Sequence, residues 1–289
     1  MLPVFCFVLM KRRDIMPTLF SDTLHRLGFE EHHRDGTTFI VPPTRLIPAG
    51  TFTMGSAPDD PYAQKRENEF PQHEVYVDAF ALALYPVTVA EYACAVAAGV
   101  AEPINRGTPH LYLRWEEQLQ YPENPVVGLT WKEARAYTDW LSKLTGQRWR
   151  LPTEAEWEKA ARGTDQRIYP WGNEWDSTRA NSIENNRGRG IRIWRYPGGL
   201  VPIGRYPDGA SPYGIYEMAG NIDEWCSSLF RPYPYVSTDG RERFSRKGRA
   251  VLRGGSWCAL PEDLRVTYRA FDHNGLDLGQ VGFRLALNP

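Results

Sequence analysis

The chain has 289 residues and a formal net charge of −1, and aromatic residues make up 13% of it. Lysine and arginine are spread along the whole length, which argues against a dedicated nucleic-acid surface, because such a surface needs clustered basic residues. Many glycines and prolines accompany the aromatic residues. We therefore expect an α+β domain with a large core and much irregular backbone, not an all-helical or all-parallel fold.

The N-terminal residues 1–44 are expected to form an extension that precedes the main domain of residues 45–289. Leu2–Met10 is apolar, but the basic residues Lys11-Arg12-Arg13 follow it, and a secretory signal has the opposite order. The run is also too short to span a bilayer. We therefore expect a cytoplasmic protein with no membrane partner.

Within this extension, Ser21–Phe29 favours a short helix and Thr38–Val41 favours a strand. The pair Pro42-Pro43 follows the strand and is typical of a boundary between elements. The main domain is therefore expected to begin directly after this pair.

Three helix starts in the main domain carry the same capping signature, a threonine followed three residues later by a glutamate. The pairs are Thr88 with Glu91, Thr130 with Glu133, and Thr153 with Glu156. In each pair the threonine oxygen can accept a hydrogen bond from a first-turn N–H while the glutamate bonds back to the cap. The second helix is predicted to end at Gly146 and the third at Gly163.

Short strands are predicted for the rest of the domain, at Val75–Ala79, Val201–Ile203, Arg249–Arg253 and Gly282–Leu287. The span 167–214 is rich in Gly, Pro and Asn and has few periodic runs. Its aromatic residues indicate that this long loop packs against the domain. We find no internal repeat and no heptads, and we expect a monomer.

The four cysteines, Cys6, Cys94, Cys226 and Cys258, lie far apart and form no C-x-x-C pair. This spacing argues against a disulfide framework or a zinc knuckle. Free thiols suit a reducing compartment.

A series of motifs along residues 45–287 resembles the formylglycine-generating-enzyme (sulfatase-modifying factor) family, and all of them stand in the family's order. They are IPAG with FTMGS (47–56), RLPTEAEWEKAARG (150–163), YPWGN (169–173), YGIYEMAGN (213–221), RGGSW (253–257) and GFR (282–284). The resemblance implies a C-type-lectin-like fold of the formylglycine-generating-enzyme subtype. Its tryptophans Trp157, Trp171, Trp225 and Trp257 are expected to be core and loop anchors.

The resemblance also implies a pair of copper-binding cysteines after the Gly-Gly-Ser-Trp segment, because soft thiolates select monovalent copper. Those two positions hold Ala259 and Leu264 here. Cys258 is one place off and alone. We therefore expect that the chain is not an enzyme; a copper-dependent formylglycine-generating oxidase remains an alternative.

The C-terminal segment of about 253–284 resembles the variable region of diversity-generating retroelement variable proteins, which share this fold. Such a region is typically rewritten at Asn codons. Randomising the first two bases of an Asn codon cannot give Gln, Lys, Glu, Met or Trp. Gln280 breaks this rule, whereas the expected ligand-binding residues obey it. These residues are Cys258, Ala259, Leu260, Asp263, Ala270, Phe271, Asp272, His273, Gly275, Leu276, Leu278 and Gly279.

The function expected from this pattern is a ligand-binding protein with a diversified, exposed recognition surface on a fixed scaffold. Its mixture of apolar and polar residues suits an unknown ligand, most naturally a protein. A non-diversified interaction module is the alternative. No cofactor is expected except a structural calcium ion, which the family resemblance implies for Asn221 and Glu224, with Asn181 at a second site. The alternative is that these polar groups cap loops by hydrogen bonding.

Overall fold

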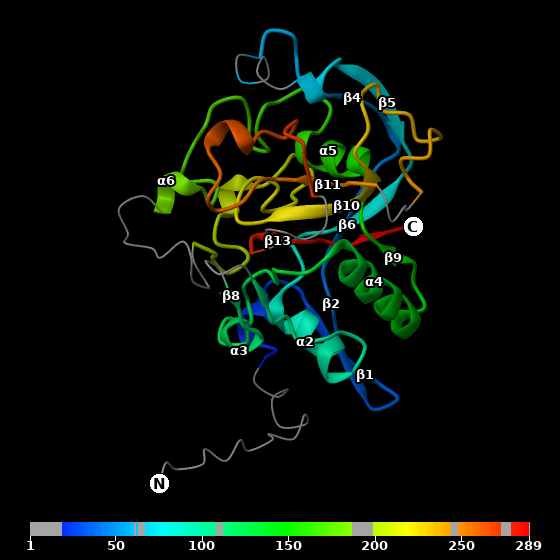
Figure 1. Cartoon of the computed structure of the whole chain (residues 1–289), viewed down its shortest axis with the longest axis vertical. Coiled ribbons are helices and arrows are strands. Elements are labelled where there is room, and N and C mark those ends of the chain that lie inside the picture. Colours follow the sequence, from blue (N-terminus) through cyan, green and yellow to red (C-terminus); the bar gives the residue numbers. More distant parts are fainter. Residues whose placement is uncertain are drawn as a thin grey trace.

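Two four-stranded sheets and the helices against them position the C-terminal segment, within the part of the chain that the structure describes (Figure 1). The structure is a computed structural model. It describes residues 19–60, 62, 67–107, 112–186, 199–243, 248–272 and 279–288. The helices are α1 (Asp22–Arg26), α2 (Val89–Ala97), α3 (Trp115–Gln118), α4 (Trp131–Thr145), α5 (Glu154–Arg162) and α6 (Ile183–Asn186), with 3₁₀ turns η3 (Glu67–Glu69), η4 (Pro207–Gly209) and η5 (Pro261–Asp263).

One sheet has the strand order β12-β11-β10-β13 and the other the order β3-β6-β14-β9, and three two-stranded ribbons complete the set. The strands are β1 (Glu30–Arg34), β2 (Thr37–Val41), β3 (Thr44–Ile47), β4 (Gly50–Met54), β5 (His73–Val77), β6 (Phe80–Ala83), β7 (Arg106–Gly107), β8 (Tyr112–Leu113), β9 (Trp149–Arg150), β10 (Asp223–Leu229), β11 (Ala250–Arg253), β12 (Ala270–Asp272), β13 (Val281–Gly282) and β14 (Ala286–Leu287). All neighbouring strands run antiparallel except β10 and β13, which run parallel.

The three predicted capping boxes are confirmed, and they begin α2, α4 and α5. In α4, for example, the Thr130 hydroxyl accepts from the Glu133 N–H at 3.3 Å and the Glu133 carboxylate accepts from the Thr130 N–H at 2.7 Å. Gly146 ends this helix with a left-handed backbone, φ 75°, as glycine allows at little cost.

The predicted strand Val201–Ile203 is not a strand in the structure. Its backbone bonds elsewhere: the Asn221 side-chain amide bonds both the N–H and the carbonyl of Val201, at 3.2 and 3.1 Å, and Ile203 N–H donates to the Glu123 carbonyl at 3.0 Å. A side chain from a distant loop therefore replaces the neighbouring strand that the sequence pattern suggested.

The predicted strand Gly282–Leu287 is divided into β13 and β14, which belong to different sheets. Arg284 lies between them and extends its buried guanidinium to Glu224, with bonds of 2.6 and 2.7 Å. The chain leaves one sheet and enters the other at Arg284, and this ion pair holds the backbone at that point.

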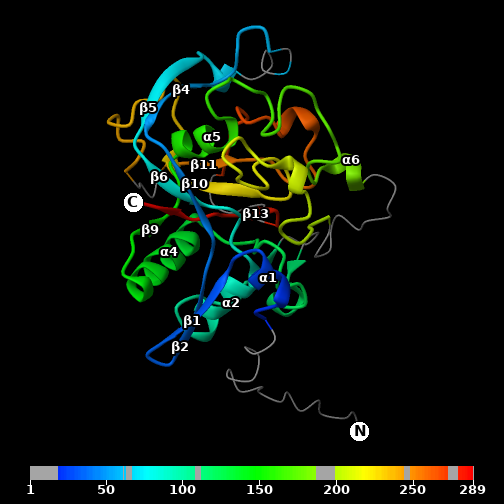
Figure 2. The ribbon, with the colours of Figure 1, turned by 180° about the vertical axis from the view of Figure 1, so that it is seen from behind.

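The described part of the extension packs on the main domain. Leu24, Phe29, Phe39 and Ile40 are buried in the same hydrophobic cluster as Tyr92 of α2. Both views place the β1–β2 hairpin beside α2, at the end of the molecule away from α5 (Figures 1 and 2).

The long span 167–214 packs down where the structure describes it. Tyr169 is buried, stacks on Trp171 with ring centroids 5.4 Å apart and also contacts Trp175. Among the residues described, no helix combines the length and the apolar character needed to cross a membrane.

Candidate functional site

Buried arginines hold the backbone of the C-terminal segment in place. Arg265 is fully buried, and its guanidinium binds Glu69 through bonds of 2.8 and 2.9 Å and Asp60 through a bond of 2.9 Å. Removing one partner of such a buried pair strongly destabilises the fold, because the other charge is left buried without compensation. The turn that follows η5 is therefore tied to the loop around Glu69, far away in the sequence.

Two more arginines tie the segment to α5. Arg269 binds Glu154 through bonds of 2.5 and 2.9 Å. Arg253 binds Glu158 and donates to the carbonyls of Thr267 and Tyr268. Burial alone would raise the pKa of Glu154, but the guanidinium groups of Arg269 and Arg253 outweigh it and lower that pKa.

The predicted ligand-binding residues nearest the Gly-Gly-Ser-Trp motif lie together around η5 at the edge of the core, where Cys258 and Ala259 pack against buried clusters. Cys258, Ala259 and Asp263 are half-buried, and Leu260 is 38% exposed. Leu264, next in sequence, is fully buried against Tyr169. The segment thus alternates between side chains that reach the surface and side chains that anchor it.

A chain of polar contacts runs beneath this face, from Asp223 through Ser256 and Cys258 to Gln280. The Ser256 hydroxyl and the Gly255 N–H donate to Asp223. The Cys258 thiol lies 3.3 Å from the Ser256 hydroxyl and donates to the Gln280 side-chain carbonyl at 2.7 Å. Burial, together with the negative charges of Asp263 and Glu224, raises the pKa of Asp223 to about 7.

Ala270, Phe271 and Asp272 lie elsewhere, on β12 at the opposite edge of the sheet from β13. The Phe271 ring packs on Phe230 with centroids 4.5 Å apart, and the Arg249 guanidinium lies 4.3 Å from its centroid. The structure therefore does not bring Phe271 together with Cys258. Of the other predicted positions, Gly279 lies in a turn before β13, and His273, Gly275, Leu276 and Leu278 lie outside the described residues.

The three residues predicted to bind calcium are separated into two environments. Asn181 and Asn221 are hydrogen-bonded to each other at 3.0 Å, and Asn221 also bonds Glu217 and Val201. Glu224 is fully buried, with both oxygens engaged by Arg284 and the Trp157 indole. A guanidinium thus occupies the place where a cation would bind Glu224, and this arrangement favours the loop-capping alternative; the calcium site stays a prediction.

The copper chemistry of the family's oxidase does not fit these residues. The two positions that would supply thiolates carry the methyl group of Ala259 and the buried side chain of Leu264. Within the described ranges, no three His, Cys, Asp or Glu side chains are grouped so as to hold a metal ion.

Asp223, Ser256 and Gln280 are site residues that the sequence did not single out as such. Asp223 and Gln280 are brought together by the parallel pairing of β10 with β13, where the Asp223 N–H donates to the Gln280 carbonyl at 3.0 Å. One signal was present: Gln280 stood out as the exception to the codon rule among the residues expected to vary.

Comparison with known proteins identifies relatives over most of the chain. The family described as Sulfatase-modifying factor enzyme 1-like domain (FGE-sulfatase) matches residues 29–289. The chain is 32% identical to serine/threonine-protein kinase pkn1 of Chlamydia pneumoniae, over 84% of this chain and 37% of that protein. It is 33% identical to hercynine oxygenase of Mycolicibacterium thermoresistibile (82% of this chain, 59% of that one). It is 30% identical to formylglycine-generating enzyme of Thermomonospora curvata (84% and 92%).

The chain thus spans 37% of the kinase and 59% of the oxygenase. Among solved structures, PvdO from Pseudomonas aeruginosa has a TM-score of 0.71 and 27% identity, covering 86% of this chain and 95% of PvdO. Treponema denticola variable protein 1 has a TM-score of 0.61 and 19% identity, covering 91% and 99%, which shows a shared fold. The predicted α+β, C-type-lectin-like fold of the formylglycine-generating-enzyme subtype is confirmed.

These relatives overturn the expectation that the chain is not an enzyme, because relatives at 30% and 33% identity over most of its length are named enzymes. That expectation rested chiefly on Ala259 and Leu264 at the two copper-binding positions, with Cys258 as a lone thiol beside them. Two positions decide the copper chemistry of one member, not the chemistry open to the whole fold. The motifs, the fold and the match over residues 29–289 agree: the chain belongs to the FGE-sulfatase family.

Proposed function

We propose that this chain is a ligand-binding member of the FGE-sulfatase family, and that its recognition surface is the face around η5 that carries Cys258, Ala259, Leu260 and Asp263. One observation carries the proposal. These side chains reach the surface, whereas the backbone between and after them is held by buried groups.

The contrast between neighbouring positions supports a surface that tolerates substitution. Surface replacements usually change stability by about 0.5 kcal/mol or less. Removing one partner of a buried ion pair, such as Arg265 with Glu69, costs about 3–5 kcal/mol. A segment with this alternation can exchange its outward residues without losing its shape, which a diversity-generating retroelement variable protein requires.

The chemistry of the face favours a protein ligand with a basic group beside an apolar one. Leu260 supplies an exposed apolar side chain, and Asp263 and Glu262 supply half-buried acidic groups beside it. Apolar anchors rimmed by polar groups are typical of protein interfaces.

A displayed library of the chain, randomised at Cys258, Ala259, Leu260 and Asp263, tests this proposal. We expect most members to remain folded and selection against a panel of unrelated basic proteins to yield binders whose affinity depends on the randomised positions. A matched library at Leu264, Arg265 and Arg269 should lose folded members. Equal loss of folding in both libraries, or folded members with no binders, would contradict the proposal.

The DNA beside the gene tests the finer part, that the face is diversified. We expect a reverse transcriptase gene and an adenine-rich copy of the codons for residues 258–280. Flanking DNA without such a copy would leave a fixed recognition surface.

The named enzymes among the relatives favour a second candidate, a reaction at the same face with Asp223 as acid or base. Its pKa of about 7 suits proton transfer near neutral pH, and Ser256 links it to Cys258 at the surface. Oxygen uptake with hercynine, and aldehyde formation in a cysteine-containing peptide, are the two assays that these relatives suggest. An activity lost in Asp223→Asn would support this candidate, and no activity in either assay would count against it.

A further inference from the structure

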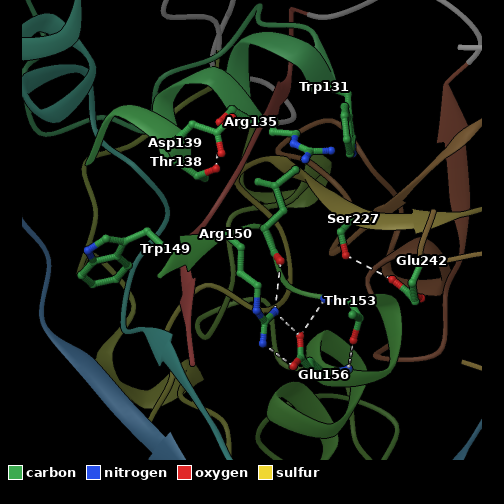
Figure 3. A pocket seen from close by; sticks show the side chains of 11 residues that line it. Trp131, Arg135, Thr138, Asp139, Trp149, Arg150, Thr153, Glu156, Ser227 and Glu242 are labelled. Atoms are coloured by element: carbon green, nitrogen blue, oxygen red, sulfur yellow. Dashed lines mark hydrogen bonds and ion pairs between the residues drawn. The ribbon is translucent and has the colours of Figure 1, made fainter. Parts of the chain in front are cut away.

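A cavity of about 350 Å³ lies away from the C-terminal segment, between α4, β9, the start of α5, β10 and the segment after β10 (Figure 3). No residue of 253–284 is among those that line it. Ligand pockets usually have volumes of about 300–1,000 Å³, so the space suits a small molecule.

One pair of charges in the cavity is already satisfied. Arg150 and Glu156 form a two-pronged ion pair with both bonds at 2.6 Å, and Glu156 also accepts from the Thr153 N–H at 2.8 Å. These residues line the cavity, but their charges are already paired, so a charged ligand gains little from them.

On the α4 side, Arg135 has no ion-pair or side-chain hydrogen-bond partner within the described part of the chain. Its guanidinium lies over the Trp131 ring, 5.6 Å from the centroid, and its side chain is exposed. Trp131 is held in turn, because its indole N–H donates to the Cys226 carbonyl at 2.8 Å. Arg135 is thus a cation on an aromatic platform, with N–H groups available for a carboxylate.

From the other side, Glu242 faces the cavity as an acidic group without a cationic partner among the residues described. Its carboxylate accepts from the hydroxyls of Ser228, Tyr235 and Ser227 at 2.6, 2.7 and 3.2 Å. Burial raises its pKa, against the effect of these hydrogen bonds. A buried carboxylate held only by neutral donors gains from a cation.

We propose that this cavity binds a small aromatic zwitterion, with its carboxylate at Arg135, its ammonium group at Glu242 and its ring against Trp131. Figure 3 shows the two opposite charges on different parts of the cavity wall, Arg135 on α4 and Glu242 in the segment after β10. Each can therefore pair with a different charged group of one ligand. Asp139, one turn after Arg135 on α4, also lines the cavity, and in Figure 3 it lies on the side of Arg135 away from Glu242.

Isothermal titration calorimetry of the full chain with L-phenylalanine tests the site, alongside phenethylamine, which lacks the carboxylate, and 3-phenylpropionate, which lacks the ammonium. We expect phenylalanine to bind at millimolar concentration or better. Arg135→Gln should weaken phenylalanine about tenfold, as the loss of one charge-assisted bond implies, and leave phenethylamine unchanged. Glu242→Gln should weaken phenylalanine and phenethylamine alike and leave 3-phenylpropionate unchanged.

Lys132→Gln on the same helix is the matched control, since it removes an exposed positive charge outside the lining and should change nothing. If Glu242→Gln fails to fold, Arg135→Gln at the exposed position still tests the site, because it should weaken phenylalanine binding and leave phenethylamine binding unchanged. The site is refuted if phenylalanine gives no binding heat, or if Arg135→Gln and Lys132→Gln weaken it equally.

Discussion

Glu91 is a buried acid whose only bonds among the described residues are those of its own helix cap. One carboxylate oxygen accepts from the Thr88 N–H at 2.7 Å and the Thr88 hydroxyl at 2.8 Å, while the other oxygen has no protein partner within the described residues. Burial raises the pKa of Glu91 to about 8, although the bonds from Thr88 oppose the shift. Its proton is therefore held more tightly in the folded state than in the unfolded state.

A group of this kind contributes stability at low pH and loses it as pH rises through the folded-state pKa. We expect the contribution of Glu91 to the free energy of unfolding to fall between its ordinary pKa, about 4.5, and its folded-state pKa, about 8. Glu91→Gln keeps the hydrogen-bond acceptor but cannot ionise, so its free energy of unfolding should decline less. The variant should therefore become more stable relative to the wild type as pH rises. Urea unfolding at a series of pH values measures both slopes. Equal slopes would show that Glu91 titrates as it does in the unfolded chain.

Ion pairs between elements determine how the C-terminal segment is held, and the pair between Glu154 of α5 and Arg269 before β12 is the clearest case. Both side chains are fully buried. The Arg269 guanidinium also lies 3.8 Å from the centroid of the Tyr233 ring. Because no other acidic side chain among the described residues forms an ion pair with Arg269, loss of Glu154 leaves a buried charge without compensation.

We expect Glu154→Gln to destabilise the protein by about 3–5 kcal/mol. Combining it with Arg269→Met should recover part of this loss, because the second change removes the stranded charge. Urea denaturation of the two single variants and the double variant measures the coupling. Glu174→Gln, at an exposed position, serves as the control. Additive losses in the double variant would mean that the two residues act independently.

The helices of this chain follow from local sequence, whereas its ion pairs do not. The capping threonines at 88, 130 and 153 and the glycine at 146 act within a few residues, so their pattern predicts the helix ends. Arg269 and Glu154 are separated by 115 positions and Arg265 and Glu69 by 196, and nothing local marks them as partners. The two predicted strands that the structure alters are 201–203, where the Asn221 side chain bonds the backbone, and 282–287, which is divided at Arg284 by its ion pair with the distant Glu224.

The candidate site shows the same division. The sequence identified the segment after Trp257, and its outward residues at 258–260 and 263 lie together, but the pairing of β10 with β13 that adds Asp223 and Gln280 is a long-range contact. The cavity at Arg135 and Glu242 is lined by residues from α4, β9, α5, β10 and the segment after β10, and no sequence motif marks it. Cytoplasmic location, a monomeric state and a protein ligand stay predictions.

At the scale of the whole molecule, the described part of the extension is built into the main core. Phe29 is 1% exposed and stacks on Tyr85 at 6.0 Å, and Tyr85 stacks on Tyr216 at 5.1 Å. We expect Phe29→Ala to cost about 3–5 kcal/mol and to lower one shared unfolding transition, since the cavity opens in a common core. Calorimetry compares the measured and van't Hoff enthalpies, with the exposed Tyr76→Ala as control. An early transition of the extension alone, with the main transition unchanged, would show instead that residues 19–44 unfold independently of the domain.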